Sequence, residues 1–552
     1  MLSVRPVSSR SLIVASGIVG LALLVALTTD LALTLLTPAK FAFLLGGFAL
    51  LIPTIVLPEP KAYWLFLLVL SIPFDITKWL SQEMFDSQAL GKMYGVPMSG
   101  TIGLEIYVTD VVLLTMLLPW LARLCLRQER LYFPKIGYLY VAYLAWSLLV
   151  SLINSVSLYL TMFEFCRQLL YFTSFIYLAN NVKTRRQLRS VVAAVFIGLI
   201  IGAGSVIAFF ELGIGTETVA FAGLHDNPTT NARNLTVHNT NRLVGSIARD
   251  RGSDIQRSQG MFRHPAIPAS LCGLTLPIVL AYLIAAQNYR DRILFFLIYA
   301  SGFIALLLTF SRAGLIGFMV GTLVFFAVGG WSRLISRRVV TLVAVASLSA
   351  AALSTPLLLV YFGQRSETFF MRFNMMEAAV MGYAQHPFLG VGLNNGTASM
   401  KASKQELRDM GIPVAPLEPA DSYYLAVLTE VGPLGFILFF GFFAQIVMIA
   451  LRAIKEVSAD MKPLLVGMVA GLASLATQSL GDGPLAGHAV GGTLWLFVAL
   501  IVAIRRYSPA ETRPSITGGE VAPAGAHVRS GELSATRAAT PSLRLDHNHW
   551  NR

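Results

Sequence analysis

Charged residues are scarce in this chain, and their scarcity excludes an ordinary soluble domain. Asp, Glu, Lys and Arg make up 13% of the 552 residues, whereas hydrophobic residues make up 55%. A soluble globular protein carries about 25% charged residues. Because the mean hydropathy is +0.67 and apolar runs recur along the chain, the sequence predicts an all-α polytopic membrane protein.

Cysteine is scarce too. Cys125, Cys166 and Cys272 stand far apart, so their spacing matches neither a disulfide framework nor a metal site, and we expect no metal and no cofactor. The net charge of +13 need not indicate nucleic acid, and we expect none as a partner. Basic residues of a membrane protein collect in cytoplasmic loops, where they contact anionic lipid.

Fourteen apolar segments are candidates for membrane spans, because a helix needs about 20 apolar residues to cross a bilayer. They are 11–28, 40–57, 62–80, 104–123, 136–153, 159–179, 190–212, 265–286, 292–310, 313–330, 339–360, 424–451, 463–480 and 488–504. The first two are the weakest. We therefore expect about 12–14 transmembrane helices.

The basic residues predict the orientation of these spans. With fourteen spans, every short link that carries a basic cluster falls on the same side, and by the positive-inside rule this side is cytoplasmic. The links hold Arg123/Arg127/Arg130/Lys135, Lys183/Arg185/Arg186/Arg189, Arg290/Arg292, Arg333/Arg337/Arg338, Arg452/Lys455/Lys462 and Arg505/Arg506. Both termini are then cytoplasmic, and the long loops 81–103, 213–264 and 361–420 lie outside.

The composition changes near the C-terminus. Residues 1–507 form the predicted membrane domain. Residues 508–552 are rich in Pro, Gly, Ala, Ser and Thr and have few apolar groups to bury. We expect this stretch to be a disordered cytoplasmic tail.

Polar groups at the predicted outer ends of the spans are candidates for chemistry. Glu164 and Arg167 stand three residues apart in one span, so they share a helix face. Arg263 follows a long segment rich in Asn and Arg, and Arg372 lies in the polar stretch 361–420. We expect these arginines to bind an anionic part of the substrate.

Arg312 is the most informative single residue, because it stands in a short turn between two apolar helices. An arginine at the centre of a bilayer costs at least about 2.5–3.5 kcal/mol, so its side chain either snorkels to the head groups or pairs with an anion. The planar guanidinium donates two parallel hydrogen bonds, which suits phosphate. With the other arginines, Arg312 predicts a phosphate or pyrophosphate site in the outer leaflet.

Other polar residues have both a structural and a chemical interpretation. His386 begins the run His-Pro-Phe-Leu-Gly-Val-Gly, where it either caps a turn or acts on the substrate. Asp421 precedes an apolar helix, where it is either an N-cap or the group that takes a proton from a hydroxyl. We expect Glu430, Gly432 and Pro433 to serve helix packing and a kink.

Several short motifs follow one another in a fixed order. They are Ser311-Arg312-Ala313-Gly314, His386-Pro387-x-x-Gly390-x-Gly392, Asp421-Ser422-x-Tyr424-Leu425, and Glu430-x-Gly432 with Gly435. This ordered set, over roughly residues 259–451, resembles the superfamily of O-antigen ligases and Wzy-type polysaccharide polymerases.

The resemblance implies a metal-independent glycosyltransferase that works on the periplasmic side of the bacterial inner membrane. Such proteins take a glycan from undecaprenyl pyrophosphate, pass it to an acceptor hydroxyl and release the lipid pyrophosphate, which arginines bind. The implied partners are the lipid-linked glycan, membrane lipid, and the chain-length regulator and flippase of the same pathway. The site residues we expect are Asp421, His386 and Arg312 for catalysis, and Arg167, Arg263, Arg312, Arg372 and Tyr424 for substrate binding.

Three functions remain open at this point. In the ligases a His begins the motif that here begins with Asp421, which favours a Wzy-type polymerase of exopolysaccharide, capsule or O-antigen. The second possibility is a ligase that transfers a finished glycan to lipid A–core or to protein. The third is a transporter or flippase of lipid-linked glycans, although charges near the midplane and repeat symmetry are typical of transporters.

Overall fold

The computed structural model describes residues 60–74, 77–79, 105–212, 258–262, 264–336, 338, 341, 366–412, 414, 422–483, 485 and 487–512. The chain divides into the units Met1–Ala510 and Glu511–Arg552, and nearly all described residues belong to the first. The predicted spans 11–28 and 40–57, nearly all of the predicted span 339–360, the loop 81–103 and the chain beyond Thr512 lie outside the described residues.

Thirteen α-helices and two short β-strands form the secondary structure of the described residues. In chain order they are α4 (Pro60–Ser71), β1 (Thr77–Trp79), β2 (Glu105–Tyr107), α6 (Val108–Cys125), α7 (Gly137–Asn154), α8 (Leu158–Asn181), α9 (Arg185–Leu212), α11 (Ala266–Ala285), α12 (Tyr289–Leu308), α13 (Arg312–Trp331), α15 (Ser366–Gln385), α16 (Gly396–Asp409), α17 (Tyr423–Glu456), α18 (Lys462–Gln478) and α19 (His488–Thr512). The predicted all-α fold is confirmed. The antiparallel pair β1–β2 is a small addition that was not predicted.

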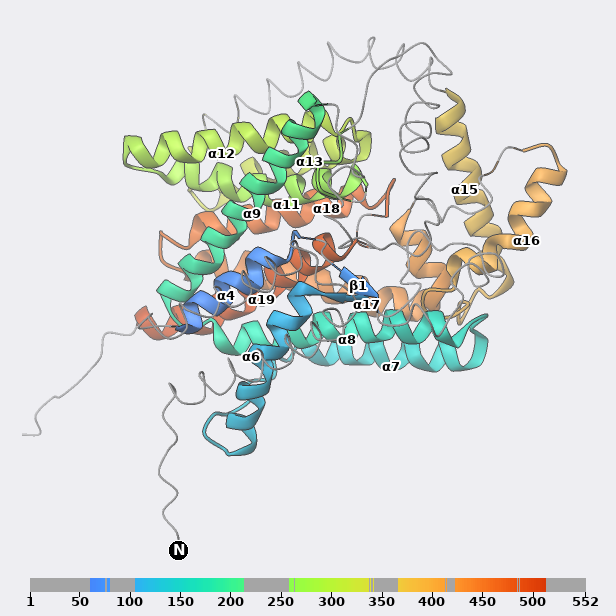
Figure 1. Cartoon of the computed structure of the whole chain (residues 1–552), viewed down its shortest axis with the longest axis horizontal. Coiled ribbons are helices and arrows are strands. Elements are labelled where there is room, and N and C mark those ends of the chain that lie inside the picture. Colours follow the sequence, from blue (N-terminus) through green and yellow to red (C-terminus); the bar gives the residue numbers. More distant parts are fainter. Residues whose placement is uncertain are drawn as a thin grey trace, which may run out of the picture. The chain divides into compact units, whose positions relative to one another are not determined.

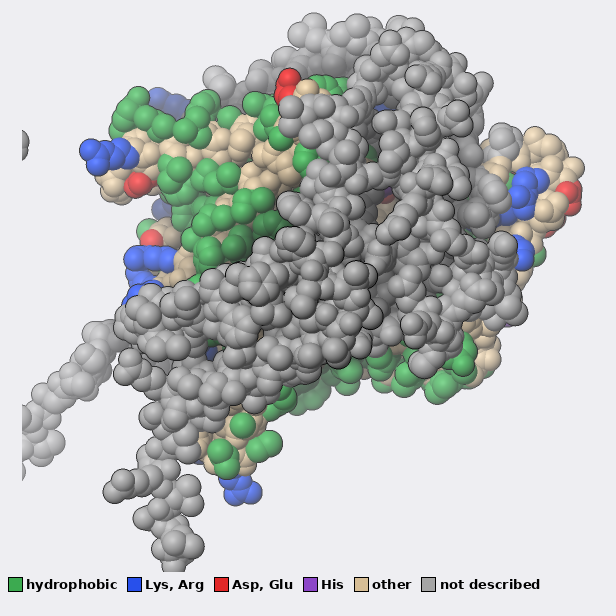
Figure 2. Space-filling model, viewed as in Figure 1, with side chains coloured by type: hydrophobic (Ala, Val, Ile, Leu, Met, Phe, Trp, Pro, Cys, Tyr) green, Lys and Arg blue, Asp and Glu red, His purple; other side chains and the backbone are tan. Residues whose placement is uncertain are grey.

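Most of the predicted spans coincide with helices. Eight described helices are long and apolar enough to cross a membrane, namely α6, α7, α9, α11, α12, α13, α17 and α19. Large hydrophobic side chains are exposed along several of them, for example Leu152 at 63% and Ile437 at 64%. On the face that Figure 2 shows, hydrophobic side chains line the helix bodies that are not grey, and Lys and Arg gather near helix ends. Such a surface is stable against lipid chains, so a multi-pass membrane protein is confirmed.

The predicted span 62–80 is wrong in its second half. Helix α4 ends at Ser71, and Thr77–Trp79 forms strand β1 against β2. Pro73 follows two residues after the helix end, and proline has no N–H with which to continue a helix. Twelve residues of helix span only about 18 Å, less than the hydrocarbon core of a bilayer.

Three helices lie in the interior of the bundle. The side chains of α11, α18 and α19 are mostly buried, and α13 packs closely on α18 (Figure 1). Glycines make this approach possible, because a Cβ at Gly317 would lie 2.6 Å from the carbonyl oxygen of Ser474. Helix α18 is therefore packed closely between α11 and α13.

Contacts between helix ends agree with the predicted alternation of the spans. Arg185 pairs with Asp460 at 3.0 Å, which joins two links predicted to lie on the basic side. On the opposite side, the backbone N–H of Tyr423 donates to the carbonyl oxygen of Ser479 at 3.0 Å. Helix ends predicted to share a side thus meet in the structure. Which side faces the cytoplasm stays a prediction.

The predicted outer loop 361–420 contains two helices rather than irregular chain. Helices α15 and α16 form a hairpin at the right of Figure 1, beside the first half of α17. A small apolar cluster joins them, with Met375 and Ala378 from α15 and Leu407 from α16. This hairpin carries Arg372 and leads into the His386 motif.

Candidate active site

The long helix α17 is broken at Gly432, where φ is +67° and Pro433 follows. Since Pro433 has no N–H, the carbonyl of Thr429 lacks its helical donor, and the N–H of Val391 supplies one at 3.0 Å. The N–H of Gly392 donates to the carbonyl of Glu430 at 2.8 Å. The predicted kink is confirmed, and the carbonyls it exposes bind another part of the chain.

The two glycine motifs therefore form one structure, which we call the kink joint (residues 388–395 and 429–433). A Cβ at Gly432 would lie 2.4 Å from the carbonyl oxygen of Phe388, and one at Gly390 would lie 2.6 Å from that of Glu430. The indole N–H of Trp146 completes the joint by donating to the carbonyl of Val431 at 2.9 Å. Only glycine permits this close crossing of two backbones.

The kink joint is also bound to the turn between α7 and α8. The side-chain oxygen of Asn395 accepts the N–H of Ser157 at 2.8 Å, and its amide nitrogen donates to the hydroxyl of Thr161 at 3.0 Å. The amide of Asn154 donates to the carbonyl of Gly390 at 3.0 Å. These bonds connect the kink joint, and with it the α15–α16 hairpin, to the adjoining ends of α7 and α8.

The carboxylate of Glu430 accepts hydrogen bonds inside the kink joint. It accepts the backbone N–H groups of Asn394 and Gly396, and Gly396 is the first residue of α16. A carboxylate at a helix N-terminus satisfies orphan donors and complements the helix dipole. Glu430 thus caps a helix that is distant in sequence, a role that packing and a kink alone do not describe.

A second polar group lies on α8. Arg167 Nη2 pairs with Glu164 Oε2 at 2.5 Å, and the amide of Gln168 donates to Glu164 Oε1 at 2.7 Å. The hydroxyl of Tyr140 donates in turn to Gln168. The predicted shared face of Glu164 and Arg167 is confirmed, and the pair is nearly buried, with side chains 7% and 13% exposed.

Tyrosines and a histidine connect this pair to neighbouring helices. Tyr423, at the start of α17, lies within range of the charges of Glu164, Arg167 and Glu430. Tyr107 is close to Arg167 and stacks on His488 at 3.6 Å between ring centroids. Helices α8, α17 and α19 therefore come together near one ion pair.

The end of α18 at Gln478 brings the remaining groups together. Arg372 Nη1 donates to the carbonyl of Gly481 at 2.8 Å, just beyond the helix end. Gln478, the last residue of α18, contacts Gly317 of α13 and donates to the carbonyl of Ala266 at 3.4 Å. The end of α18 is thus surrounded by the starts of α11, α13 and α17 and by Arg372 of α15.

Arg312 is the first residue of α13, where Ser311 is the N-cap and accepts the N–H of Gly314 at 3.2 Å. A cation at a helix N-terminus is disfavoured by the helix dipole, typically by about 0.3–1 kcal/mol. The half-buried Arg312 therefore does not stabilise this helix. Its positive charge and the positive end of the helix dipole together create a region that favours an anion.

Residues 271–440 match the family model described as O-Antigen ligase, Wzy_C. The chain carries a Wzy_C domain. The matched stretch contains Arg312, Arg372, His386 and the whole kink joint, so the resemblance seen in the sequence is confirmed. Arg167 lies outside it, on α8. No curated protein matches the chain.

The other predicted site residues of the Wzy_C domain are less closely connected. His386 is exposed after the end of α15, and none of the described residues is bonded to its imidazole. Tyr424 stacks on Phe440 at 4.6 Å and donates its hydroxyl to the carbonyl of Ala476. Asp421, within the Wzy_C match, and Arg263, which precedes it, lie outside the described residues.

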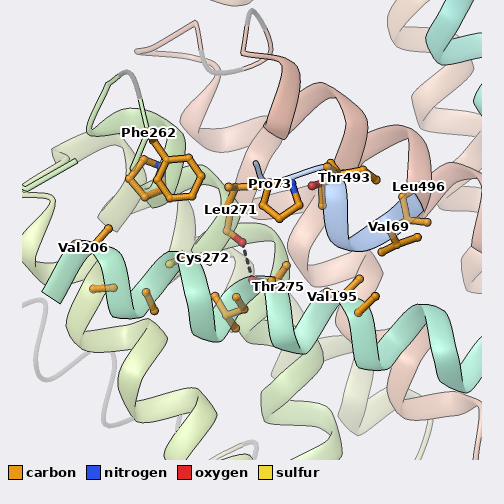
Figure 3. Close-up of a pocket in the computed structure, with 18 residues that line it drawn as sticks. Val69, Pro73, Val195, Val206, Phe262, Leu271, Cys272, Thr275, Thr493 and Leu496 are labelled. Carbon is orange, nitrogen blue, oxygen red and sulfur yellow. Dashed lines mark hydrogen bonds between the residues drawn. The ribbon is translucent and has the colours of Figure 1, made fainter. Parts of the chain in front are cut away.

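An apolar crevice lies between α4, α9, α11 and α19 (Figure 3). Val69, Pro73, Leu271 and Phe262 are among its walls, and the hydroxyl of Thr275 turns back to the carbonyl of Leu271 at 2.6 Å. None of the described residues that line it is charged. Among the described residues, the crevice therefore offers a ligand apolar contact rather than a charged partner.

Sequence reasoning missed the residues that hold the site together. Trp146, Asn395 and Tyr423 act through contacts across hundreds of residues, which a single sequence does not reveal. One signal was present for Glu430, because an acidic residue within an apolar helix needs a specific partner. Among the described residues, no group of three or more His, Cys, Asp and Glu gathers as a metal site.

Proposed function

We propose that the protein is a Wzy-type polymerase that joins oligosaccharide repeat units carried on undecaprenyl pyrophosphate. The observation that carries the proposal is that Arg372 bonds to Gly481 just beyond the end of α18, while Gln478 at the same helix end packs against Gly317, five residues after Arg312. Arg167 is linked to the same helix end through Tyr423. Two described arginines of the Wzy_C domain, with a third nearby, would suit the two phosphates of such a donor.

In the proposed reaction the acceptor hydroxyl attacks the anomeric carbon of the donor glycan. The bond between this carbon and the pyrophosphate oxygen breaks, and undecaprenyl pyrophosphate leaves with the electron pair. Asp421 takes the hydroxyl proton as general base. Negative charge grows on the leaving group, so arginines that are already in place stabilise the transition state more than the ground state.

The kink joint would give this site its rigidity. Arg372 and His386 lie on the hairpin side of the joint, and Tyr423 lies on the α17 side. A fixed distance between them keeps donor and acceptor groups aligned, which accounts for a large part of many enzymatic rates. In this proposal Tyr424 contacts the glycan, and the active side of the bundle is the periplasmic side of the bacterial inner membrane.

A ligase is the second candidate, and the description of the matched family favours it. Asp421, at the place of the ligase His, favours the polymerase. A deletion strain complemented with the gene separates the two functions. A polymerase restores long glycans on the lipid carrier, whereas a ligase leaves polymer length unchanged and restores attachment to lipid A–core or protein. If the deletion strain still makes long glycans and still attaches them, both candidate functions are contradicted.

A further inference from the structure

At the end of the bundle opposite the candidate active site, basic side chains surround one carboxylate. Glu129 Oε1 lies 3.3 Å from Arg123 Nη1, and Oε2 lies 3.9 Å from Lys183 Nζ. The half-buried Lys61, at the start of α4, lies within range of all three of these charges. One carboxylate therefore faces three cations from α4, α6 and the α8–α9 link.

A fourth cation joins this group from α19. The guanidinium carbon of Arg506 lies 4.1 Å from the ring centroid of Tyr132 and 5.0 Å from that of Tyr507. Tyr132 is fixed by two backbone hydrogen bonds with the amide of Asn180, both 2.9 Å long. Tyr507 lies within range of the charges of both Arg506 and Glu129, so Arg506 belongs to the same region as this carboxylate. We call Lys61, Arg123, Lys183 and Arg506 the basic cluster.

Two donors in and next to the basic cluster have no acceptor among the described residues. Arg506 Nη1 and the hydroxyl of Tyr507 are buried, and no described residue lies within hydrogen-bond reach of either. A buried donor without a partner costs about 1–3 kcal/mol, and more when it is charged. Snorkelling does not explain them, because a snorkelling head group ends in water. Both donors point to a missing anionic acceptor.

We propose that the basic cluster binds the phosphate of an anionic phospholipid head group. Four cations against one carboxylate leave an excess of three positive charges, which is more than enough to attract the one or two negative charges of a phospholipid head group. Basic pockets between transmembrane helices are well suited to such head groups. Arg506 and Tyr507 would donate to the phosphate oxygens, and Lys61 and Lys183 would approach as point charges.

The test uses the full-length protein in nanodiscs of neutral phosphatidylcholine, to which phosphatidylglycerol or cardiolipin is added. We expect the added lipid to raise the melting temperature in a saturable way. Arg506→Gln should weaken the apparent affinity about tenfold or more, as should Lys61→Gln. Arg506→Lys keeps the charge and should retain part of the effect. Native mass spectrometry of the same samples should show bound anionic lipid in the wild type.

Arg290→Gln is the matched control, because it removes one exposed arginine from the same end of the bundle, at the start of α12. Equal losses in this control and in Arg506→Gln would show a diffuse surface effect and overturn the site. An absence of lipid stabilisation in the wild type would overturn it too. If inorganic phosphate alone gives the same saturable shift, the cluster binds phosphate but its ligand is a soluble one.

This inference does not rest on the proposed function. Lipid binding at the basic cluster is measured without any glycan donor. If the protein binds anionic lipid at the basic cluster but makes no polymer, the lipid site stands and the proposed polymerase function is refuted.

Discussion

The backbone N–H of Gly392 donates to the carbonyl oxygen of Glu430 at 2.8 Å. This bond joins two motifs that stand 38 positions apart in the sequence (430 minus 392). It exists because Gly432 and Pro433 break α17 and leave carbonyls without helical donors. The position of the α15–α16 hairpin therefore depends on a kink in a membrane helix.

Replacement of Gly432 should break this joint. In Gly432→Ala the new Cβ would lie 2.4 Å from the carbonyl oxygen of Phe388, at a φ of +67° that disfavours any side chain. We expect a loss of about 2 kcal/mol or more of stability and a lower melting temperature in detergent. Gly204→Ala is the control, because nothing lies within 4 Å of its Cβ. A Gly432→Ala protein as stable as this control would disprove the close crossing.

Removal of the Glu430 carboxylate should loosen the start of α16. Glu430→Ala leaves the N–H groups of Asn394 and Gly396 without an acceptor, and Glu430→Gln keeps one of the two bonds. Backbone amide hydrogen exchange in the first turn of α16 should therefore be fastest in Glu430→Ala, intermediate in Glu430→Gln and slowest in the wild type. The exposed Glu377→Gln, on α15, should match the wild type. If amide exchange in Glu430→Ala equals that of the wild type, Glu430 does not cap α16.

The sequence was sufficient for most of the apolar helices and for local features of the candidate site, but not for the contacts that connect them. The turn before Arg312 and the shared face of Glu164 and Arg167 follow from local spacing, and the structure has both. The pairing of Val391 with Thr429 does not follow, because it depends on which backbones meet in space. The two helices in the polar stretch 361–420 were not predicted either, since α16 is amphipathic and buries only a narrow face.

Substitution of Arg312 tests whether its guanidinium binds an anion or only snorkels to the head groups. Arg312→Lys keeps the charge but loses the planar fork, and a hydrogen bond to a charged group is worth roughly 1.5–3 kcal/mol. We expect polymer formation to fall about tenfold to a hundredfold in Lys, and further in Ala. Arg408→Lys, at an exposed position of α16, should keep full activity. If Arg312 only snorkels, the Lys variant will be as active as the wild type.

The predicted sidedness can be measured by thiol labelling in intact spheroplasts. The native Cys125 and Cys166 are first replaced by Ser, and single cysteines are placed at exposed positions of the two opposite ends. Lys401→Cys, on α16, should react with an impermeant reagent. Gln287→Cys, in the α11–α12 link, should react only after permeabilisation. The reverse pattern would place the arginine site in the cytoplasm.

The most direct measurement is turnover of a lipid-linked glycan by the purified protein in nanodiscs. The substrate is a defined oligosaccharide repeat unit on a long-chain polyprenyl pyrophosphate, supplied without nucleotide sugar or any other protein. We predict a ladder of longer lipid-linked glycans and release of one polyprenyl pyrophosphate for each bond formed, with both products lost in Arg312→Ala at normal folding. An intact substrate after incubation with well-folded wild-type protein, or an equal ladder from Arg312→Ala, would contradict the proposed reaction and its site.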